Sequence, residues 1–459
     1  MKRNRKKLTG LIVAIIVIGV CTLLQSSRAP EDKGIMGIGI LAASLVLWST
    51  ETLPMSVTTM LMICVLAFTN IMSFNDAIAN IGVNTSLFIM ASSGITIAVG
   101  NSSIPRHLTK MIISSTGNNS KKLVVSMGFL IAICSAFMSS LATCALFNSI
   151  LLPFLHENNL KPGKSKLGKC LMLMIPACAG IGGFMSPAGT PANILLIDLL
   201  EINNIAITFG QWCLVGFPIG LIAVGLFSVS LISIFPPEAL SDQELEHSGV
   251  FTTMNACDKK TVVIVGAVIA LWFVSGWVQS LNTTMIAVIG MSVMFMPGIE
   301  LLDWDKFSDG VNWDLVLTMG TVSVLMTGIA RTGVMNKIST TVLSGIGDMP
   351  LLLSMICVSL SICIIRAFVP TTTAVVALLA PMLIELSSAT GFSILNLLLI
   401  LGFWTASALL IVYTEPIYLI TFGNRYYRGA DLLKAGLVPC VLLSVITVLL
   451  IPFITQMIM

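Results

Sequence analysis

The sequence predicts an all-α polytopic membrane protein with about eleven transmembrane helices, two re-entrant hairpins and two repeats of inverted topology. The 459-residue chain is 56% hydrophobic and only 10% charged, with a mean hydropathy of +0.99. A soluble domain cannot bury that much apolar surface. Apolar runs of spanning length recur along the whole chain, and two of them are broken by small polar residues at matching places in the two halves.

The predicted spans begin directly after a basic N-terminus. The apolar run from Leu8 to Leu24 is long for a secretory signal, so we expect it to be an uncleaved first helix. Ten further spans are expected at about 35–50, 55–73, 80–104, 168–200, 211–235, 262–281, 285–301, 311–333, 393–420 and 435–457.

The placement of basic residues predicts the orientation. With the N-terminus in the cytoplasm, nineteen lysines and arginines fall on the cytoplasmic side and four on the outer side. This bias is the one expected of a correct orientation. We therefore expect a multi-pass protein of the inner or plasma membrane.

Internal similarity predicts two repeats. Residues 76–117 run in parallel with 304–347, and both contain Gly-Val-Asn followed by a span and a polar break. An odd number of spans per repeat inverts the second repeat relative to the first. The division expected is a first helix and outer loop (1–34), repeat 1 (35–235), a cytoplasmic linker (236–261) and repeat 2 (262–459).

Each repeat contains a predicted hairpin, at about 122–155 and 350–387, and Pro153 and Pro381 close the two hairpins. Small polar residues separate two apolar arms, each of which is expected to be too short to span. Non-helical backbone at membrane depth is tolerated only where it lines a cavity or is buried in protein. Paired breaks of this kind indicate the binding site of a transporter.

A broken helix follows each hairpin. In the first half it runs from Gly182 to Asn193, and in the second from Tyr413 to Ile417. Glycine and proline free backbone groups from the helical ladder. Freed carbonyls suit a small cation, and exposed helix N-termini suit an anion.

Other classes of protein are less compatible with the sequence. No Walker-type glycine loop is present, which argues against ATP-driven transport, and neither paired catalytic carboxylates nor a Ser/His couple is offered at membrane depth, so no enzyme is expected. Eleven cysteines are scattered singly, as buried structural residues usually are. A channel remains an alternative because re-entrant hairpins also line pores.

Several motifs resemble the divalent anion:sodium symporter family of di- and tricarboxylate and sulfate transporters. The segment Trp48-Ser49-Thr50-Glu51-Thr52-Leu53-Pro54 is similar to a Trp-x-Thr-Glu-x-x-Pro motif of the family, and further similar segments are Asn312-Trp313-Asp314, Gly189-Thr190-Pro191-Ala192-Asn193, Phe422-Gly423 and Leu432-Leu433-Lys434-Ala435-Gly436. The resemblance implies eleven spans, two hairpins, a homodimer, and a transport domain that slides against a scaffold in an elevator-like motion.

The resemblance also implies site residues. The family has Ser-Asn-Thr at each hairpin tip, where this chain has Thr371-Thr372-Thr373 in the second half. In the first half the internal repeat aligns Ser140-Leu141-Ala142, whereas counting from Pro153 aligns Thr143-Cys144-Ala145. The predicted substrate-binding residues are Ser140, Thr143, Thr190, Asn193, Thr371, Thr372, Thr373, Thr414 and Pro416. The predicted cation-binding or coupling residues are Ser140, Gly189, Thr373 and Glu415.

Two charged residues stand out at membrane depth. Arg366 precedes the second tip, and Glu415 lies in the second broken helix. An ion pair between them is the favoured interpretation, because arginine avoids hydrocarbon unless its charge is compensated. The alternatives are that Arg366 binds the anion or replaces a cation, and that Glu415 carries protons or binds sodium.

We therefore expect a secondary active transporter of a small anion, such as succinate, citrate or sulfate, that is coupled to sodium. A proton-coupled carrier or an anion exchanger that uses Glu415 and Arg366 is the alternative. No organic cofactor and no nucleic acid are expected, and the partners are the anion, sodium or protons, the lipid bilayer and a second copy of the chain.

Overall fold

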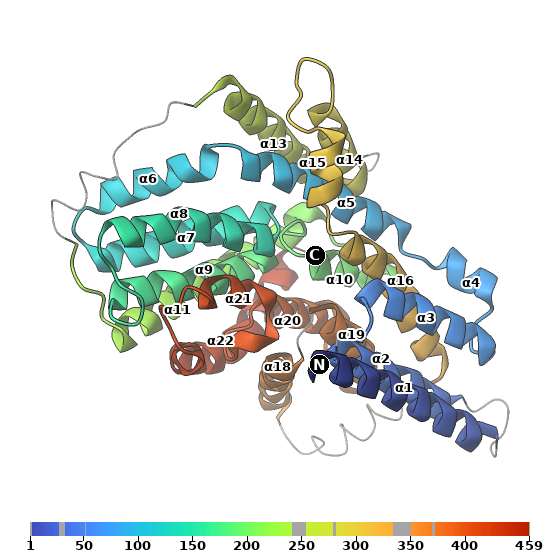
Figure 1. The fold of residues 1–459 in the computed structure, drawn as a ribbon. Coiled ribbons are helices and arrows are strands. Elements are labelled where there is room, and N and C mark those ends of the chain that lie inside the picture. Colours follow the sequence, from blue (N-terminus) through green and yellow to red (C-terminus); the bar gives the residue numbers. More distant parts are fainter. Residues whose placement is uncertain are drawn as a thin grey trace.

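The computed structural model describes residues 2–26, 33–50, 52–240, 254–278, 281–333, 350–369 and 372–458. Throughout these residues the regular structure is helical (Figure 1). Eight segments of the described chain are long and apolar enough to cross a membrane: Lys7–Gln25, Phe74–Asn101, Ser120–Phe137, Lys166–Met185, Phe209–Ile234, Trp313–Arg331, Leu351–Phe368 and Gly429–Ile458. The polytopic all-α class is thereby confirmed.

Both halves of the chain have helices where the sequence predicts spans. The helices of the first half are α1 (Lys2–Ser26), α2 (Gly34–Ser49), α3 (Met55–Phe68), α4 (Phe74–Ala79), α5 (Val83–Asn101), α6 (Ile104–Thr116), α7 (Ser120–Phe137), α8 (Ser140–Glu157), α9 (Lys166–Met185), α10 (Pro191–Ile202) and α11 (Phe209–Ile234).

The helices of the second half are α13 (Ala256–Val274), α14 (Thr283–Met294), α15 (Trp304–Gly310), α16 (Trp313–Arg331), α18 (Leu351–Phe368), α19 (Thr372–Thr390), α20 (Ile394–Ala406), the 3-10 helix η1 (Val412–Thr414), α21 (Pro416–Phe422) and α22 (Gly429–Ile458). The predicted linker is described only over 236–240 and 254–261, and Glu51 lies outside the described residues. Inversion of the second repeat stays a prediction.

The two predicted hairpins are present as helix pairs, but one expectation about them is wrong. The first arms, α7 and α18, are 18 residues each and reach the length of a span. Eighteen residues rise about 27 Å, close to the ~30 Å of a hydrocarbon core. Packing rather than arm length therefore supports the hairpins, because α7 lies against α8 and α18 against α19 (Figure 1).

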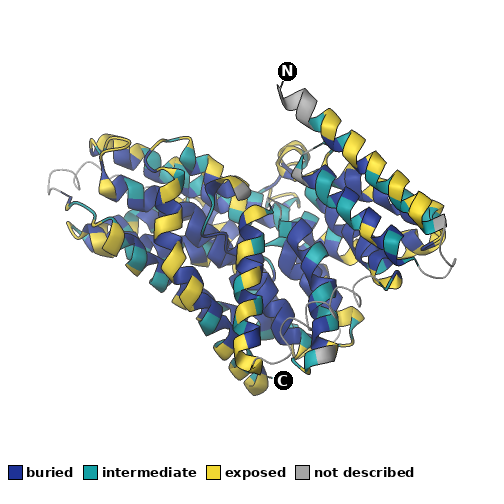
Figure 2. Cartoon of the chain, turned by 90° about the horizontal axis from the view of Figure 1, so that it is seen from below, coloured by how far each residue is buried: buried dark blue, intermediate teal, exposed yellow. Residues whose placement is uncertain are grey.

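The helices form two groups that meet along a boundary. We call α1–α5 and α13–α16 the peripheral group, and α7–α11 with α18–α22 the hairpin group. Figure 2 shows two bodies that widen away from each other, each with a buried interior and exposed outer helix faces. Contacts across the boundary are made by α2, α5, α13 and α16 of the peripheral group and by α8, α10, α11 and α19 of the hairpin group.

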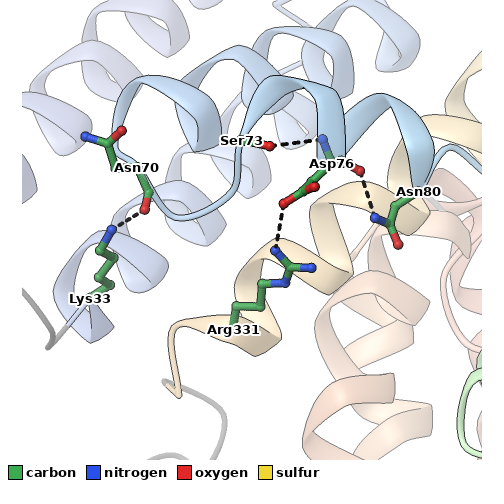
Figure 3. Close-up of polar contacts among 6 residues, drawn as sticks. All are labelled: Lys33, Asn70, Ser73, Asp76, Asn80 and Arg331. Carbon is green, nitrogen blue, oxygen red and sulfur yellow. Dashed lines mark hydrogen bonds and ion pairs between the residues drawn. The ribbon is translucent and has the colours of Figure 1, made fainter.

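Polar contacts fix the end of the peripheral group around the short helix α4 (Figure 3). Ser73 caps α4 by accepting a hydrogen bond from the Asp76 amide at 3.1 Å. The Asp76 carboxylate pairs with Arg331, in the last turn of α16, at 3.7 Å. The Lys33 ammonium donates to the carbonyl of Asn70. These contacts tie the loop between α3 and α4 to α2 and α16.

The hairpin group is built around α9, which is buried over nearly its whole length. Segments of this group approach one another so closely that no side chain fits between their backbones. A Cβ atom on Gly182 would lie 2.2 Å from the carbonyl oxygen of Ala132 on α7. A Cβ atom on Gly436 of α22 would lie 1.9 Å from the carbonyl oxygen of Leu409. The glycines therefore set how closely α7 and α22 pack in this group.

Replacing Gly182 by alanine should destabilise the protein, because a backbone carbonyl cannot move away as a flexible side chain can. We expect a loss of about 1–3 kcal/mol, the usual range for overpacking. The measurement is the melting temperature of purified protein in detergent. Gly225→Ala on α11, where nothing lies within 4 Å of the added atom, is the matched control. Equal melting temperatures for the two variants would contradict this account of the packing.

Candidate functional site

The tip of the first hairpin lies between α7 and α8. Met138 and Ser139 are extended, and Ser140 is the first residue of α8. The hydroxyl of Ser135 donates to the carbonyl of Ala179 on α9 at 2.6 Å and lies 3.2 Å from the hydroxyl oxygen of Ser140. The tip is therefore attached to α9, and of the two predicted registers the structure places Ser140, not Thr143, at the tip.

Thr143 lies one turn further along α8. Its side chain is fully buried, and its hydroxyl oxygen has no hydrogen-bond partner. A buried hydroxyl without a partner is costly and usually signals a water, ion or ligand that completes it.

The first broken helix is interrupted from Ser186 to Thr190, between α9 and α10. This is shorter than predicted, because Gly182 and Asn193 lie inside the two helices. The Asn193 amide nitrogen donates to the carbonyls of Gly183 at 2.8 Å and Ser186 at 2.7 Å. One buried side chain on α10 thus satisfies two carbonyls at the α9 end of the break, which would otherwise be orphaned.

Uncharged oxygen atoms gather at this first break. The Ser140 hydroxyl lies 3.5 Å from the carbonyl oxygen of Gly189. The Asn193 side-chain oxygen is buried and has no hydrogen-bond partner. Thr190 precedes α10, and its hydroxyl does not cap the helix. Four predicted residues thus lie around one break, in a set of hydroxyl, carbonyl and amide oxygens that suits a small hard cation. We name Ser140, Gly189 and Asn193 the oxygen cluster.

The second hairpin tip is only partly described. Pro370 and Thr371 lie outside the described residues, so the predicted role of Thr371 is not examined by the structure. Thr372 begins α19 and is half-buried, and Thr373 is buried beside it. The tip therefore presents two threonines at the start of a 19-residue helix.

The side chain of Arg366 connects this second tip to the second broken helix. Arg366 is 1% exposed and lies in the last turn of α18. Its Nη1 donates to the carbonyl of Val369 at 2.8 Å, and its Nε donates to the carbonyl of Thr405 at 3.0 Å. Its Nη2 forms an ion pair with the carboxylate of Glu415. The predicted ion pair is confirmed, and the guanidinium also satisfies two backbone carbonyls.

The second broken helix is interrupted over a longer stretch than predicted. Helix α20 ends at Ala406, and α21 begins at Pro416, with Glu415 directly before it. The predicted break covered only Tyr413 to Ile417. The residues from Ser407 to Glu415 contain neither glycine nor proline, so the sequence carries no signal for the earlier half of the break. Thr414 lies in η1, and Pro416 is exposed at the helix start.

Sequence reasoning missed two buried polar side chains at this break. Ser407 and Tyr418 are buried, and neither hydroxyl has a hydrogen-bond partner. Tyr418 occupies the same position in α21 as Asn193 does in α10. The backbone N–H of Tyr418 donates to the carbonyl of Glu415 at 3.1 Å, and the backbone N–H of Asn193 donates to the carbonyl of Thr190 at the same distance. The shared spacing from the proline could have identified Tyr418.

The two halves meet within the hairpin group. The thiol of Cys144 on α8 donates to the carbonyl of Ile417 on α21 at 3.1 Å. A Cβ atom on Gly180 of α9 would lie 2.6 Å from the carbonyl oxygen of Ala406, where α20 ends. Each broken helix therefore packs against elements of the other half. Two hairpins and two broken helices inside an apolar helical body are the construction of a secondary transporter.

Comparison with known families leads to the same class. The model of the citrate transporter family, CitMHS, matches residues 45–375 and 276–457, and the chain belongs to this family. It is similar to an uncharacterized transporter of Haemophilus influenzae, with 21% identity over 93% of each chain.

Two further relatives carry names that describe dicarboxylate transport. A sodium-dependent dicarboxylate transporter of Staphylococcus saprophyticus is 22% identical over 98% of this chain and 92% of its own length. A sodium-dependent high-affinity dicarboxylate transporter of Caenorhabditis elegans is 20% identical over 97% and 87%. The resemblance to sodium-coupled dicarboxylate transporters is confirmed, and the protein is a transporter, not an enzyme.

Removing one partner of the buried ion pair should destabilise the protein more than removing both. Glu415→Gln leaves the Arg366 guanidinium buried without its counter-charge, a change that typically costs about 3–5 kcal/mol. The double variant Arg366→Gln/Glu415→Gln removes both charges and should recover part of the lost melting temperature in detergent.

Arg331→Gln is the control for this cycle, because it removes an ion pair that is about half exposed, and such pairs contribute ~0–1 kcal/mol. A double variant less stable than Glu415→Gln alone would contradict the pairing.

Proposed function

We propose that the protein is a secondary active transporter of a small anion, a di- or tricarboxylate such as succinate or citrate or an oxyanion such as sulfate, coupled to sodium. In this proposal it lies in the inner or plasma membrane as a homodimer with its N-terminus in the cytoplasm. The observation that carries the proposal is the oxygen cluster at the first break, where the Asn193 oxygen is buried without a partner.

In this proposal the oxygen cluster binds sodium, and the hairpin tips bind the anion. Sodium coordination would supply the electrostatic partner that the Asn193 oxygen lacks within the protein. The anion would be held by Thr143, Thr190, Thr371, Thr372 and Thr373, with Thr414 and Pro416 nearby in the second half. The N-terminal ends of α8, α10 and α19 supply backbone amides and the positive end of the helix dipole, both of which favour an anion.

The proposed movement is an elevator motion of the hairpin group against the peripheral group. The boundary between the groups supports this, because the hairpins and both broken helices lie wholly on one side of it. Two hydrogen bonds cross it from α5: Thr85 donates to Asp198, and the Ser139 amide donates to the Thr96 hydroxyl at 3.4 Å. A group that carries the complete site can move without taking the site apart.

An anion exchanger is the second candidate, favoured by the contacts of Arg366. Its guanidinium binds two carbonyl oxygens and a carboxylate at the second break, and these oxygens would otherwise be available to coordinate a cation. The charge of Arg366 is permanent and cannot be released in each cycle, so the second half would need no coupling ion.

Proton coupling through Glu415 is a separate alternative. If Glu415 carries protons, Glu415→Gln should abolish proton coupling.

Uptake into proteoliposomes tests the proposed function. Labelled succinate, citrate and sulfate are offered with and without an inward sodium gradient. We expect saturable uptake of at least one anion that requires sodium. Uptake that needs only a preloaded internal anion would favour the exchanger, and linear, unsaturable flux would favour a channel. Absence of uptake for all three anions would contradict the assigned substrates.

Asn193→Ala should reduce sodium-dependent uptake at least about tenfold, because it removes one oxygen of the cluster. It also removes the hydrogen bonds that the side-chain amide donates to the carbonyls of Gly183 and Ser186. The sodium concentration for half-maximal uptake should rise if the protein folds. Asn203→Ala, which removes a similar amide-to-carbonyl bond of 2.7 Å at the far end of α10, is the matched control. Unchanged sodium dependence in Asn193→Ala would contradict the cation site.

A further inference from the structure

An acidic residue lies on the boundary between the two groups and has no part in the site described above. Asp198 is half-buried on α10, a helix that otherwise buries apolar residues and Asn193. The hydroxyl of Thr85 on α5 donates to the Asp198 carboxylate. Thr85 is fully buried, so this contact lies inside the interface and not on its rim. An ionisable residue within a membrane-spanning region indicates a function.

The α5 side of the contact favours the ionised carboxylate of Asp198, whereas partial burial and the negative charge of Glu201 disfavour it. Thr85 lies in the first turn of α5, whose N-cap Gly82 supplies no side-chain cap, and the positive end of that helix favours a nearby anion. On its own helix, Asp198 has exposed Glu201 one turn away.

The other helices packed against α10 bring few charges. The helices α5 and α20 carry no charged residue. On α16, Asp314 accepts a hydrogen bond from the Ser56 amide at 3.0 Å, and Arg331 pairs with Asp76. On α19 the charged residue is Glu385. Thr85 is thus the described group that donates directly to the Asp198 carboxylate.

Beyond its first turn, α5 presents apolar side chains that cannot stabilise an ionised Asp198. Its buried face continues with Phe88, Ile89, Ala91 and Ile95. If the hairpin group moves along α5, Asp198 leaves Thr85 and meets these apolar side chains. A carboxylate is costly there, whereas a protonated carboxyl group is neutral and passes more easily.

We propose that Asp198 is a proton-binding site that controls the movement of the hairpin group: the ionised carboxylate holds α10 at Thr85, and a proton taken up from water releases it. This proposal rests on the elevator motion of the proposed function. In the proposed orientation the start of α5 and the end of α10 lie at the outer face, so the proton comes from outside. It binds one carboxylate oxygen, forms the neutral acid, and leaves when Asp198 is again exposed to water.

The first test does not depend on transport. Hydrogen exchange of the purified protein is measured at about pH 8 and about pH 5.5 and expressed as protection factors, which removes the chemical pH dependence of exchange. We expect protection of α10 and the first turns of α5 to fall at least about tenfold at the lower pH. In Asp198→Asn, whose side chain is neutral at both values, the two protection factors should agree.

Variants at Thr85 test whether the hydroxyl holds the ionised form. Thr85→Val removes the donor that stabilises the carboxylate, so the pH of the transition should rise by about one unit. Thr85→Ser keeps a hydroxyl and should restore the original value. The control is Thr96→Val, which removes the other bond across the boundary and should keep the pH response of the wild type.

Uptake provides the second test. The wild-type rate should increase as external pH falls, whereas Asp198→Asn should be insensitive to pH to within about twofold. A wild-type pH response in Asp198→Asn, in both exchange and uptake, would overturn the proposal while leaving sodium-coupled transport intact. If no anion is transported at all, the proposed function fails, and the exchange measurement alone decides whether Asp198 binds the proton that loosens the boundary.

Discussion

Non-helical backbone inside a membrane must find its hydrogen bonds within the protein, and the architecture of the hairpin group follows from that constraint. Each break in a helix releases carbonyls and amides that water cannot reach. In the first half the Asn193 side-chain amide satisfies two such carbonyls, those of Gly183 and Ser186. In the second half the Arg366 guanidinium does so, with Glu415 compensating its charge. The breaks are thus maintained by specific side chains, not by flexibility.

The same constraint is met differently in the two halves, and the difference bears on coupling. The amide of Asn193 is neutral and leaves its own oxygen buried and free to accept. The guanidinium of Arg366 is a permanent cation that donates to the carbonyls around it. In our proposal the first half therefore accepts a mobile cation, and the second half carries a fixed one. An element order repeated along the chain need not give two equivalent ion sites.

Much of this architecture could be predicted from the sequence, because its signals are local. Apolar runs located the helices, and glycine and proline located the first break. The predicted second break is too short, because Ser407 and its neighbours are residue types that helices accept. Only tertiary contacts keep this segment from continuing helix α20. Asp198 was missed because its significance depends on Thr85, which is remote in sequence. Tyr418 was missed although its spacing from Pro416 matches that of Asn193 from Pro191. The ion pair was predicted because two charges at membrane depth require each other.

The difference between the halves is tested most directly by the sodium dependence of the initial uptake rate at saturating anion. One open cation site predicts a hyperbolic dependence with a Hill coefficient of about 1. A coefficient of about 2 or more would mean that a second sodium binds despite Arg366 and would contradict the account. A rate that does not depend on sodium would contradict the assignment of the oxygen cluster itself.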